Sequence, residues 1–264
     1  MSTDAESPAA TSNGVRAARR ALDILSLLRS TRPTLTLKIV LEETGLPRTT
    51  ALRLLETLQQ AGLLWASGRN TYVAGPTLLR WSELAAQGWQ LPEGTRETMR
   101  EIADRTGETV SVYIRSDVHR ICIAAEESPQ ALRHVPHIGT EQPLWVGSPA
   151  KVLLAAAPES LLPRVAALSP WGEAHLPTLR QWRADALRDG YSVSHGERED
   201  GQSVAAAPVV DSHGETLAAL SIAGPTARFT DEHVQDFLRE LFALATQMSS
   251  ASFENSPALR YRQD

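Results

Sequence analysis

The sequence has only one cysteine, Cys122, among its 264 residues. A single cysteine excludes an internal disulfide framework and is typical of the reducing cytoplasm, where we expect this chain to act. No apolar run approaches the ~18–20 residues of a membrane span, so we expect no membrane partner. The opening residues, MSTDAESPAATSNG, are polar and acidic, which is unlike a signal peptide and predicts a short disordered lead.

Motifs of the common enzyme classes are also missing. The chain has no G-x-S-x-G, G-x-x-x-x-G-K-[ST] or H-E-x-x-H, and no G-x-G-x-x-G after a strand. Ser148, His195 and Asp211 are residue types of a hydrolase triad, but their spacing does not indicate one. The HVPH run (134–137) has no further ligand at metal-site spacing. We therefore expect no catalytic residue, no metal and no cofactor.

Net charge is −5, which argues against a nucleic-acid ligand when the chain is taken as a whole. The distribution of charge reverses that argument. Residues 14–75 contain nine Lys or Arg and four Asp or Glu, a net charge of +5, whereas residues 76–264 carry −8. A basic head on an acidic body is typical of a DNA-binding protein with a second function in its body.

Residues 35–64 contain two amphipathic helical patterns separated by a short break, Gly45-Leu46-Pro47. The first pattern covers 36–44 and begins after an N-cap, Thr34 or Thr36. The second begins at Pro47 and extends to about residue 61, where Gly62 ends it. About fourteen residues make a helix of roughly 21 Å, enough to lie in a DNA groove.

A further helical pattern over 15–30 precedes this pair, and two β-rich runs follow it. The runs 63–65 and 71–73 are joined by a turn-rich segment, 66–70. Three helices followed by a hairpin predict a winged helix-turn-helix.

We expect DNA contacts from the start of the helix that begins at Pro47, from the helix over 36–44 and from the hairpin tip. Arginine binds guanine through two hydrogen bonds, and threonine contacts phosphate or a thymine methyl group. These candidates are Arg48, Thr49, Thr50, Arg53, Lys38, Arg69 and Asn70. The leucines of the same helix, Leu52, Leu54, Leu55 and Leu58, are expected mostly in the core.

The rest of the chain predicts an α+β body behind a linker helix. Helical patterns cover 95–106, 148–157, 177–189 and 230–248, and β-rich runs cover 110–114, 121–126, 203–211 and 216–224. We expect these segments: lead 1–13, DNA-binding domain 14–75, linker helix 76–92, body 93–250 and tail 251–264.

The order of these segments resembles the IclR family of bacterial transcription regulators. The head, VRAARRALDILSLL followed by TLKIVLEETGLPRTTALRLLETLQQAGLL, is similar to the family's winged helix. In the body, GETVSVYIRSDVHRICIAAEESPQALRH, GTEQPLWVGSPAKVLLA and GYSVSHGEREDGQSVAAAPVVDSHGETLAALSIAGPTARF resemble family blocks. The resemblance covers about residues 14–248. It implies a GAF-like effector-binding domain, a ligand pocket in each body, and dimers or dimers of dimers.

The resemblance also implies which residues line the pocket. It carries over to Ser148, Pro149, Ser194, Gln202, Val204, Ser221 and Ala223. Four positions depart from the family pattern, namely Trp145 for His, Ala150 for Gly, Val204 for Cys and Ala223 for Ser, and they predict a more apolar pocket. Candidate wall residues are Leu144, Trp145, Val112 and Val135, with Arg133 as a cation at the mouth. Ser148 opens a helix, so its free N–H groups and Ser221 are expected to bind a carboxylate.

We therefore expect a ligand-responsive repressor that binds a pseudo-palindromic operator as a dimer or tetramer. Its effector is expected to be a small organic acid with an apolar or aromatic part. Two alternatives stay open: a small-molecule-binding module without specific DNA readout and, with less support, a hydrolase.

Overall fold

The computed structural model describes residues 8–29 and 31–250, which form two compact units divided between Gln87 and Gly88. The segments 1–7 and 251–264, which belong to the expected lead and tail, lie outside the described residues. No helix in the described ranges is long and apolar enough to cross a bilayer.

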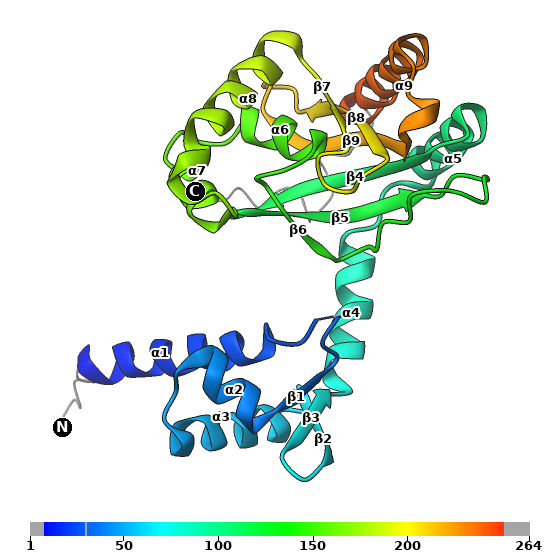
Figure 1. Cartoon of the computed structure of the whole chain (residues 1–264). Coiled ribbons are helices and arrows are strands. Elements are labelled where there is room, and N and C mark those ends of the chain that lie inside the picture. The colour runs from blue at the N-terminus through cyan, green and yellow to red at the C-terminus, as the bar shows by residue number, and fades with distance from the viewer. Residues whose placement is uncertain (1–7, 30, 251–264) are drawn as a thin grey trace, which may run out of the picture. The chain divides into compact units, whose positions relative to one another are not determined.

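The N-terminal unit contains three helices and a small antiparallel sheet, coloured blue to cyan in Figure 1. In chain order the elements are α1 (Pro8–Leu25), β1 (Thr34–Thr36), α2 (Leu37–Thr44), α3 (Arg48–Gln60), β2 (Leu64–Gly68), β3 (Thr71–Ala74) and α4 (Thr77–Gly88). The sheet order is β1-β3-β2, with β2 and β3 forming the expected hairpin. This is a winged helix-turn-helix, as predicted.

The first helix is displaced toward the N-terminus from the expected range of 15–30. Helix α1 begins at Pro8, since proline is tolerated in a first turn, so residues 8–13 of the expected disordered lead are helical. It ends at Leu25 because the N–H groups of Leu27 and Leu28 donate to carbonyls three residues back, which tightens and closes the last turn.

The turn between α2 and α3 follows the predicted signals. Thr36 caps α2, with its hydroxyl oxygen accepting from the Ile39 N–H at 3.3 Å. Gly45 ends the helix at φ +63°, a left-handed conformation that glycine adopts without strain, and its N–H donates to the Leu41 carbonyl. Pro47 then precedes α3.

The C-terminal unit is a six-stranded antiparallel sheet covered by helices on both faces, as Figure 1 shows. The elements are α5 (Glu93–Thr106), β4 (Thr109–Ser116), β5 (His119–Glu126), β6 (Glu141–Pro143), α6 (Ser148–Ala155), α7 (Leu161–Leu168), α8 (Leu176–Asp189), β7 (Ser192–His195), β8 (Gln202–Val210), β9 (Thr216–Pro225) and α9 (Asp231–Ser250), with short 3-10 turns at Gly172–His175 and Thr226–Arg228. The sheet order is β6-β5-β4-β9-β8-β7. The sequence patterns did not predict α7, β6 or, in the N-terminal unit, β1.

Alternating residues of the central strands divide the unit into two cores. On β9, Leu220 and Ile222 pack in the core under α5 and α9, while Ala219 packs in the core under α6, α7 and α8. Ser221 and Ala223 are small and lie at the α6 side of the sheet, which leaves room for the first turn of α6. The sheet is thus positioned to form a pocket where α6 begins.

Candidate DNA interface and effector pocket

Helix α3 has one buried stripe and one exposed stripe. Ala51, Leu55 and Leu58 are buried in the core of the N-terminal unit, at the i, i+4, i+7 spacing of one helix face. Arg48, Thr49 and Arg53 are exposed, and Thr50 is half-buried. No side chain caps the start of α3, so its first N–H groups remain available to an anion such as a phosphate.

Leu52 lies on the exposed stripe rather than in the core. The sequence analysis expected it to be mostly buried, but 36% of its surface is accessible. The reason is its angular position, because a residue that follows Ala51 points about 100° away from the core direction. Leu52 therefore places an exposed apolar group one turn after Arg48 and next to Arg53, a position that the sequence analysis did not predict.

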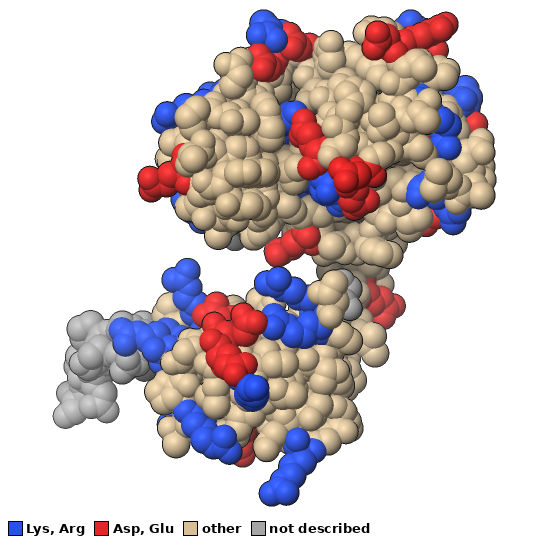
Figure 2. Space-filling view, viewed as in Figure 1, with Lys and Arg blue, Asp and Glu red and all other residues tan. Residues whose placement is uncertain are grey.

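An open hollow of about 490 Å³ lies beside the start of α3. Its lining residues come from α2, α3 and the hairpin: Thr36, Leu37, Lys38, Leu41, Glu42, Arg48, Arg69, Asn70 and Thr71. The structure thus brings four of the seven DNA candidates to one concave surface, and Thr49, Thr50 and Arg53 do not line it. Figure 2 shows basic side chains at several places on the visible face of this unit.

The candidate effector pocket lies beside the first turn of α6. Its lining residues are Tyr113, Arg120, His134, Gln142, Gly147, Pro149, Ser194, Glu197, Arg198, Gln202, Val204, Ser221 and Ala223. Six expected residues are among them, namely Pro149, Ser194, Gln202, Val204, Ser221 and Ala223. Its volume is about 20 Å³, the room of one water molecule, so a larger ligand requires the lining to move.

Ser148 lies directly behind this lining. It is fully buried, and its Oγ is 2.8 Å from Ser194 Oγ and 2.7 Å from the Val204 carbonyl oxygen. Trp145 and Arg133 do not line the cavity. Trp145 packs against the core under α6, and the Arg133 guanidinium binds the Glu127 carboxylate at 2.8 Å.

None of the expected apolar wall residues lines this cavity. Val112 faces the core under α5 and α9, Leu144 is fully buried in the other core, and Val135 is exposed. A bulge between Val112 and Tyr113 shifts the register of β4 against β5, and the tyrosine lines the cavity instead of the valine.

The residues that the sequence analysis missed are mostly polar: Tyr113, Arg120, His134, Gln142, Gly147, Glu197 and Arg198. One of them carried a signal in the sequence. Arg120 lies directly before the apolar run ICIAAE, and a charged residue in a mostly buried strand points to a special environment.

The donors at the start of α6 are already occupied by groups of the protein. The Gly147 N–H donates to Glu197 Oε2 at 3.1 Å, and the Ser148 N–H donates to Ser194 Oγ at 3.2 Å. The Glu197 carboxylate also pairs with the Lys151 ammonium, which lies 4.3 Å from the centre of the Trp182 ring. The helix start that was expected to bind an effector carboxylate therefore holds an internal one.

Burial changes the ionisation of three groups that line the pocket. It raises the pKa of Tyr113 to about 12, lowers the pKa of Arg120 to about 10 and lowers the pKa of His134 to about 4. At neutral pH the tyrosine and the histidine are uncharged, whereas Arg120 is a cation.

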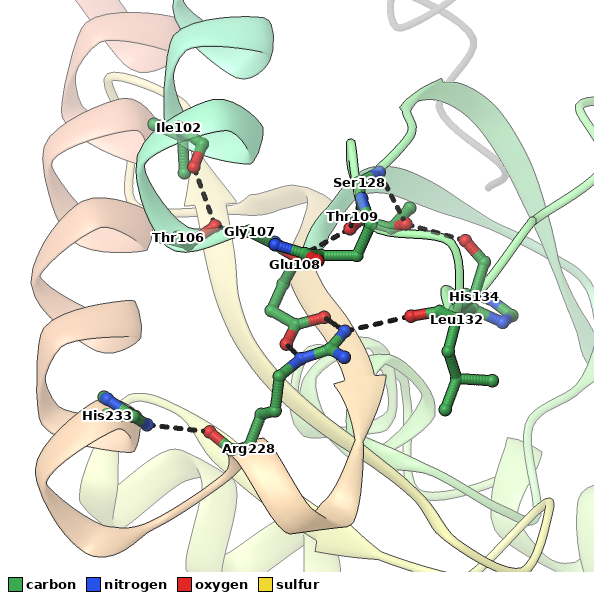
Figure 3. Close-up of polar contacts among 11 residues, drawn as sticks. Ile102, Thr106, Gly107, Glu108, Thr109, Ser128, Leu132, His134, Arg228 and His233 are labelled. Carbon is green, nitrogen blue, oxygen red and sulfur yellow. Dashed lines mark hydrogen bonds and ion pairs between the residues drawn. The ribbon is translucent and has the colours of Figure 1, made fainter.

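The segment that carries His134 is tied to the sheet by a polar cluster, shown in Figure 3. Thr109 Oγ1 donates to the His134 carbonyl at 2.6 Å, and Arg228 Nη2 donates to the Leu132 carbonyl at 3.1 Å. Arg228 also pairs with the Glu108 carboxylate, which is 1% exposed. Gly224 makes this pairing possible, because a Cβ there would lie 1.9 Å from Glu108 Oε2.

Two further observations concern Cys122 and metal binding. Cys122 is a buried free thiol whose pKa burial raises to about 11. Across residues 8–29 and 31–250, no group of three or more His, Cys, Asp or Glu side chains is arranged to hold a metal ion.

The fold and these two sites define a class of two-unit protein with a winged helix-turn-helix head and an α+β body that encloses a small polar cavity. Comparison with known families agrees with that class. The model described as "IclR helix-turn-helix domain" matches residues 17–65, and the model described as "Bacterial transcriptional regulator IclR C-terminal" matches residues 84–250. The chain therefore belongs to the IclR family of bacterial transcriptional regulators, which are not enzymes.

Individual relatives cover nearly the whole chain. The transcriptional repressor IclR of Escherichia coli is 27% identical over 253 residues, 90% of each chain. A crystal structure of a putative IclR-family regulator from Rhodococcus sp. is 40% identical, covers 94% of this chain and 97% of its own, and has a TM-score of 0.61. A Microbacterium hydrocarbonoxydans homologue in complex with 4-hydroxybenzoate has a TM-score of 0.65 at 20% identity, with coverage of 89% and 100%. The α+β body is the GAF-like domain of this family.

Proposed function

We propose that this protein is a ligand-responsive repressor that reads its operator with α3. The observation that carries the proposal is the exposed stripe of α3. Arg48 and Arg53 lie on it, and no ion pair joins either of them to another described residue. Free guanidinium groups on a helix of this length are suited to guanine in the major groove.

The other contacts follow from the position of each side chain. Thr49 lies at the uncapped helix start, where it and the N–H groups reach a phosphate, while half-buried Thr50 has a smaller contact. Leu52 is suited to a thymine methyl group. Lys38 binds a phosphate, and the hairpin tip with Arg69 and Asn70 reaches the minor groove or the backbone.

We propose that the protein acts in the cytoplasm as a homodimer or a dimer of dimers on a pseudo-palindromic operator. Helix α4 supports self-association, because it buries no residue within the chain and exposes Leu79, Trp81 and Leu84. A two-fold dimer would read two half-sites whose centres lie about 34 Å apart, which is one helical turn of DNA, or a multiple of that distance.

We propose a small organic acid, in part apolar or aromatic, as the effector. It would enter the cavity lined by Pro149, Ser194, Gln202, Val204 and Ser221, with Ala223 beside them and Ser148 behind. Trp145 and Arg133 could take part only after the lining moves. The 4-hydroxybenzoate bound to the Microbacterium homologue supports this ligand class. DNA affinity and effector affinity are then linked reciprocally, by about 1–3 kcal/mol in typical systems.

Fluorescence anisotropy tests the proposal. The purified protein is titrated into labelled DNA from directly upstream of its own gene and into a scrambled fragment, over a series of salt concentrations. We expect nanomolar binding to the native fragment, on the order of a thousandfold tighter than to the control.

Equal and steeply salt-dependent binding to both fragments would contradict the operator assignment. It would mean that only phosphates are contacted. If no fragment from the neighbourhood of the gene is preferred, a small-molecule-binding module without specific readout becomes the better description.

A further inference from the structure

Arg120 is a buried cation without a carboxylate partner. The side chain is 3% exposed and lines the effector pocket from β5. Its guanidinium donates to the carbonyl oxygens of Pro143 and Val146 and to Gln142 Oε1, at 2.8 Å for Val146 and 2.9 Å for Gln142. Its Nε finds no acceptor among the described residues, and no described acid pairs with it.

The other charges around the pocket are matched one to one. Glu197 pairs with Lys151, and Arg198 pairs with Glu199 at 2.6 Å. One positive charge, that of Arg120, is therefore left without a counter-charge. An uncompensated buried charge is costly, and the neutral oxygens around Arg120 offset only part of that cost.

We propose that Arg120 is the specificity-determining residue for the effector's charge and selects a monoanion, with the carboxylate held on the Arg120 side of the cavity. This inference rests on the effector pocket proposed above and changes where the anion binds. The start of α6 is the other candidate position, but its donors are bound to Glu197 and Ser194. A carboxylate beside Arg120 gains a charge-assisted hydrogen bond and displaces no internal anion.

The neighbours of Arg120 fit this role. Its guanidinium carbon lies 5.6 Å from the centre of the Tyr113 ring, and that phenol is uncharged at neutral pH. Gln142 on β6 accepts a hydrogen bond from the guanidinium, which fixes the orientation of the Arg120 side chain. Because the Tyr113 phenol is uncharged, it does not repel an incoming anion.

The test compares small acids with their neutral amides, using the full-length protein at pH 7 and constant ionic strength. The probes are acetate against acetamide, benzoate against benzamide, and 4-hydroxybenzoate against 4-hydroxybenzamide, and the readout is the midpoint of thermal unfolding. We expect at least one acid to raise the midpoint in a concentration-dependent way while its amide does not. Equal shifts for acids and amides, or no shift with any acid, would overturn the inference.

Two variants then locate the charge that is recognised. Arg120→Met should weaken binding of the acid by roughly tenfold or more. Arg164→Met should leave it nearly unchanged, because the Arg164 guanidinium pairs with Asp117 at 2.6 Å and does not line the pocket. The opposite pattern would overturn the inference. If Arg120→Met does not fold, Arg120→Lys keeps the cation and should keep the preference for acid over amide. Loss of that preference in a folded Arg120→Lys would count equally against it.

DNA binding without ligand separates this inference from the proposed function. Wild-type protein that binds acids through Arg120 but shows no operator preference would refute the repressor assignment alone. Specific DNA binding together with indifference to acid and amide would refute the Arg120 assignment alone.

Discussion

The two units place positive charge in opposite environments. On the N-terminal unit, Arg48 and Arg53 are exposed and unpaired within the described chain, so they act on a partner from solvent. In the C-terminal unit, Arg120 is buried, and Arg228 is bound to the buried Glu108. Exposed cations attract a polyanion at long range and are screened by salt, whereas a buried cation acts at one fixed point and resists screening. Substitutions should therefore change binding in the first unit and stability or ligand choice in the second.

The largest effect is expected from breaking the buried ion pair. Arg228→Met leaves the Glu108 carboxylate buried without its partner, which should lower the free energy of unfolding of the C-terminal unit by about 3–5 kcal/mol. Denaturant unfolding followed by circular dichroism measures this loss.

A matched control is Arg105→Met. The Arg105 guanidinium lies 2.8 Å from the Glu240 carboxylate, but both side chains are partly exposed, so the cost should stay below about 1 kcal/mol. The double variant Glu108→Gln, Arg228→Met should recover part of the loss. Equal costs for the two single variants would show that burial does not distinguish the pairs.

The next effect is on DNA binding. Arg53→Ala should weaken operator binding by about 1–3 kcal/mol and relax the preference at one base pair, without changing stability. Anisotropy with the operator and with single-base variants of it measures both quantities.

Lys38→Ala is the control for phosphate contacts. It should weaken binding to operator and scrambled DNA alike and reduce the salt slope by about one, because it removes one counterion-releasing contact. If Arg53→Ala gave the same uniform loss, α3 would not be reading bases.

The sequence predicted the head better than the pocket, for a physical reason. Thr36, Gly45 and Pro47 act on the backbone next to them, so the break between α2 and α3 is visible in a short run of residues. The pocket instead depends on the sheet order and on a bulge beside Tyr113, which no local pattern shows. Family resemblance supplied Ser194 and Ser221 and the other small residues around them.

The polar part of the pocket was missed because it depends on contacts between residues far apart in the sequence, such as those of Arg120 with Gln142 and Val146. Arg120 lies within a block that resembles the family, but the resemblance assigned no pocket role to it. Leu52 was wrongly predicted to be buried for a different reason. A leucine next to a buried stripe is counted as core until it is known which face of the helix packs against the rest of the unit.

The smallest effect concerns pH and also separates the two units. All seven histidines follow residue 118, so the head contains none. Burial, reinforced by Arg198, lowers the pKa of His134 to about 4, below its unfolded value of about 6.5. Between those values the unfolded chain binds the proton more readily, so stability is present above pH 6.5 and is lost as the pH falls.

We expect wild-type protein to lose roughly 1 kcal/mol more than His134→Asn between pH 7 and pH 5, a figure reduced for the partial exposure of the ring. Urea unfolding at a series of pH values measures the difference. His213→Asn, an exposed position in the β8–β9 turn, serves as the control and should follow the wild-type curve. Burial also lowers the pKa of His175, which should leave some pH dependence in the His134→Asn variant. Parallel curves of unfolding free energy against pH for wild-type protein and His134→Asn would contradict this prediction. They would mean that the imidazole is as well solvated in the folded protein as in the unfolded chain. The segment that carries His134 would then not close the pocket.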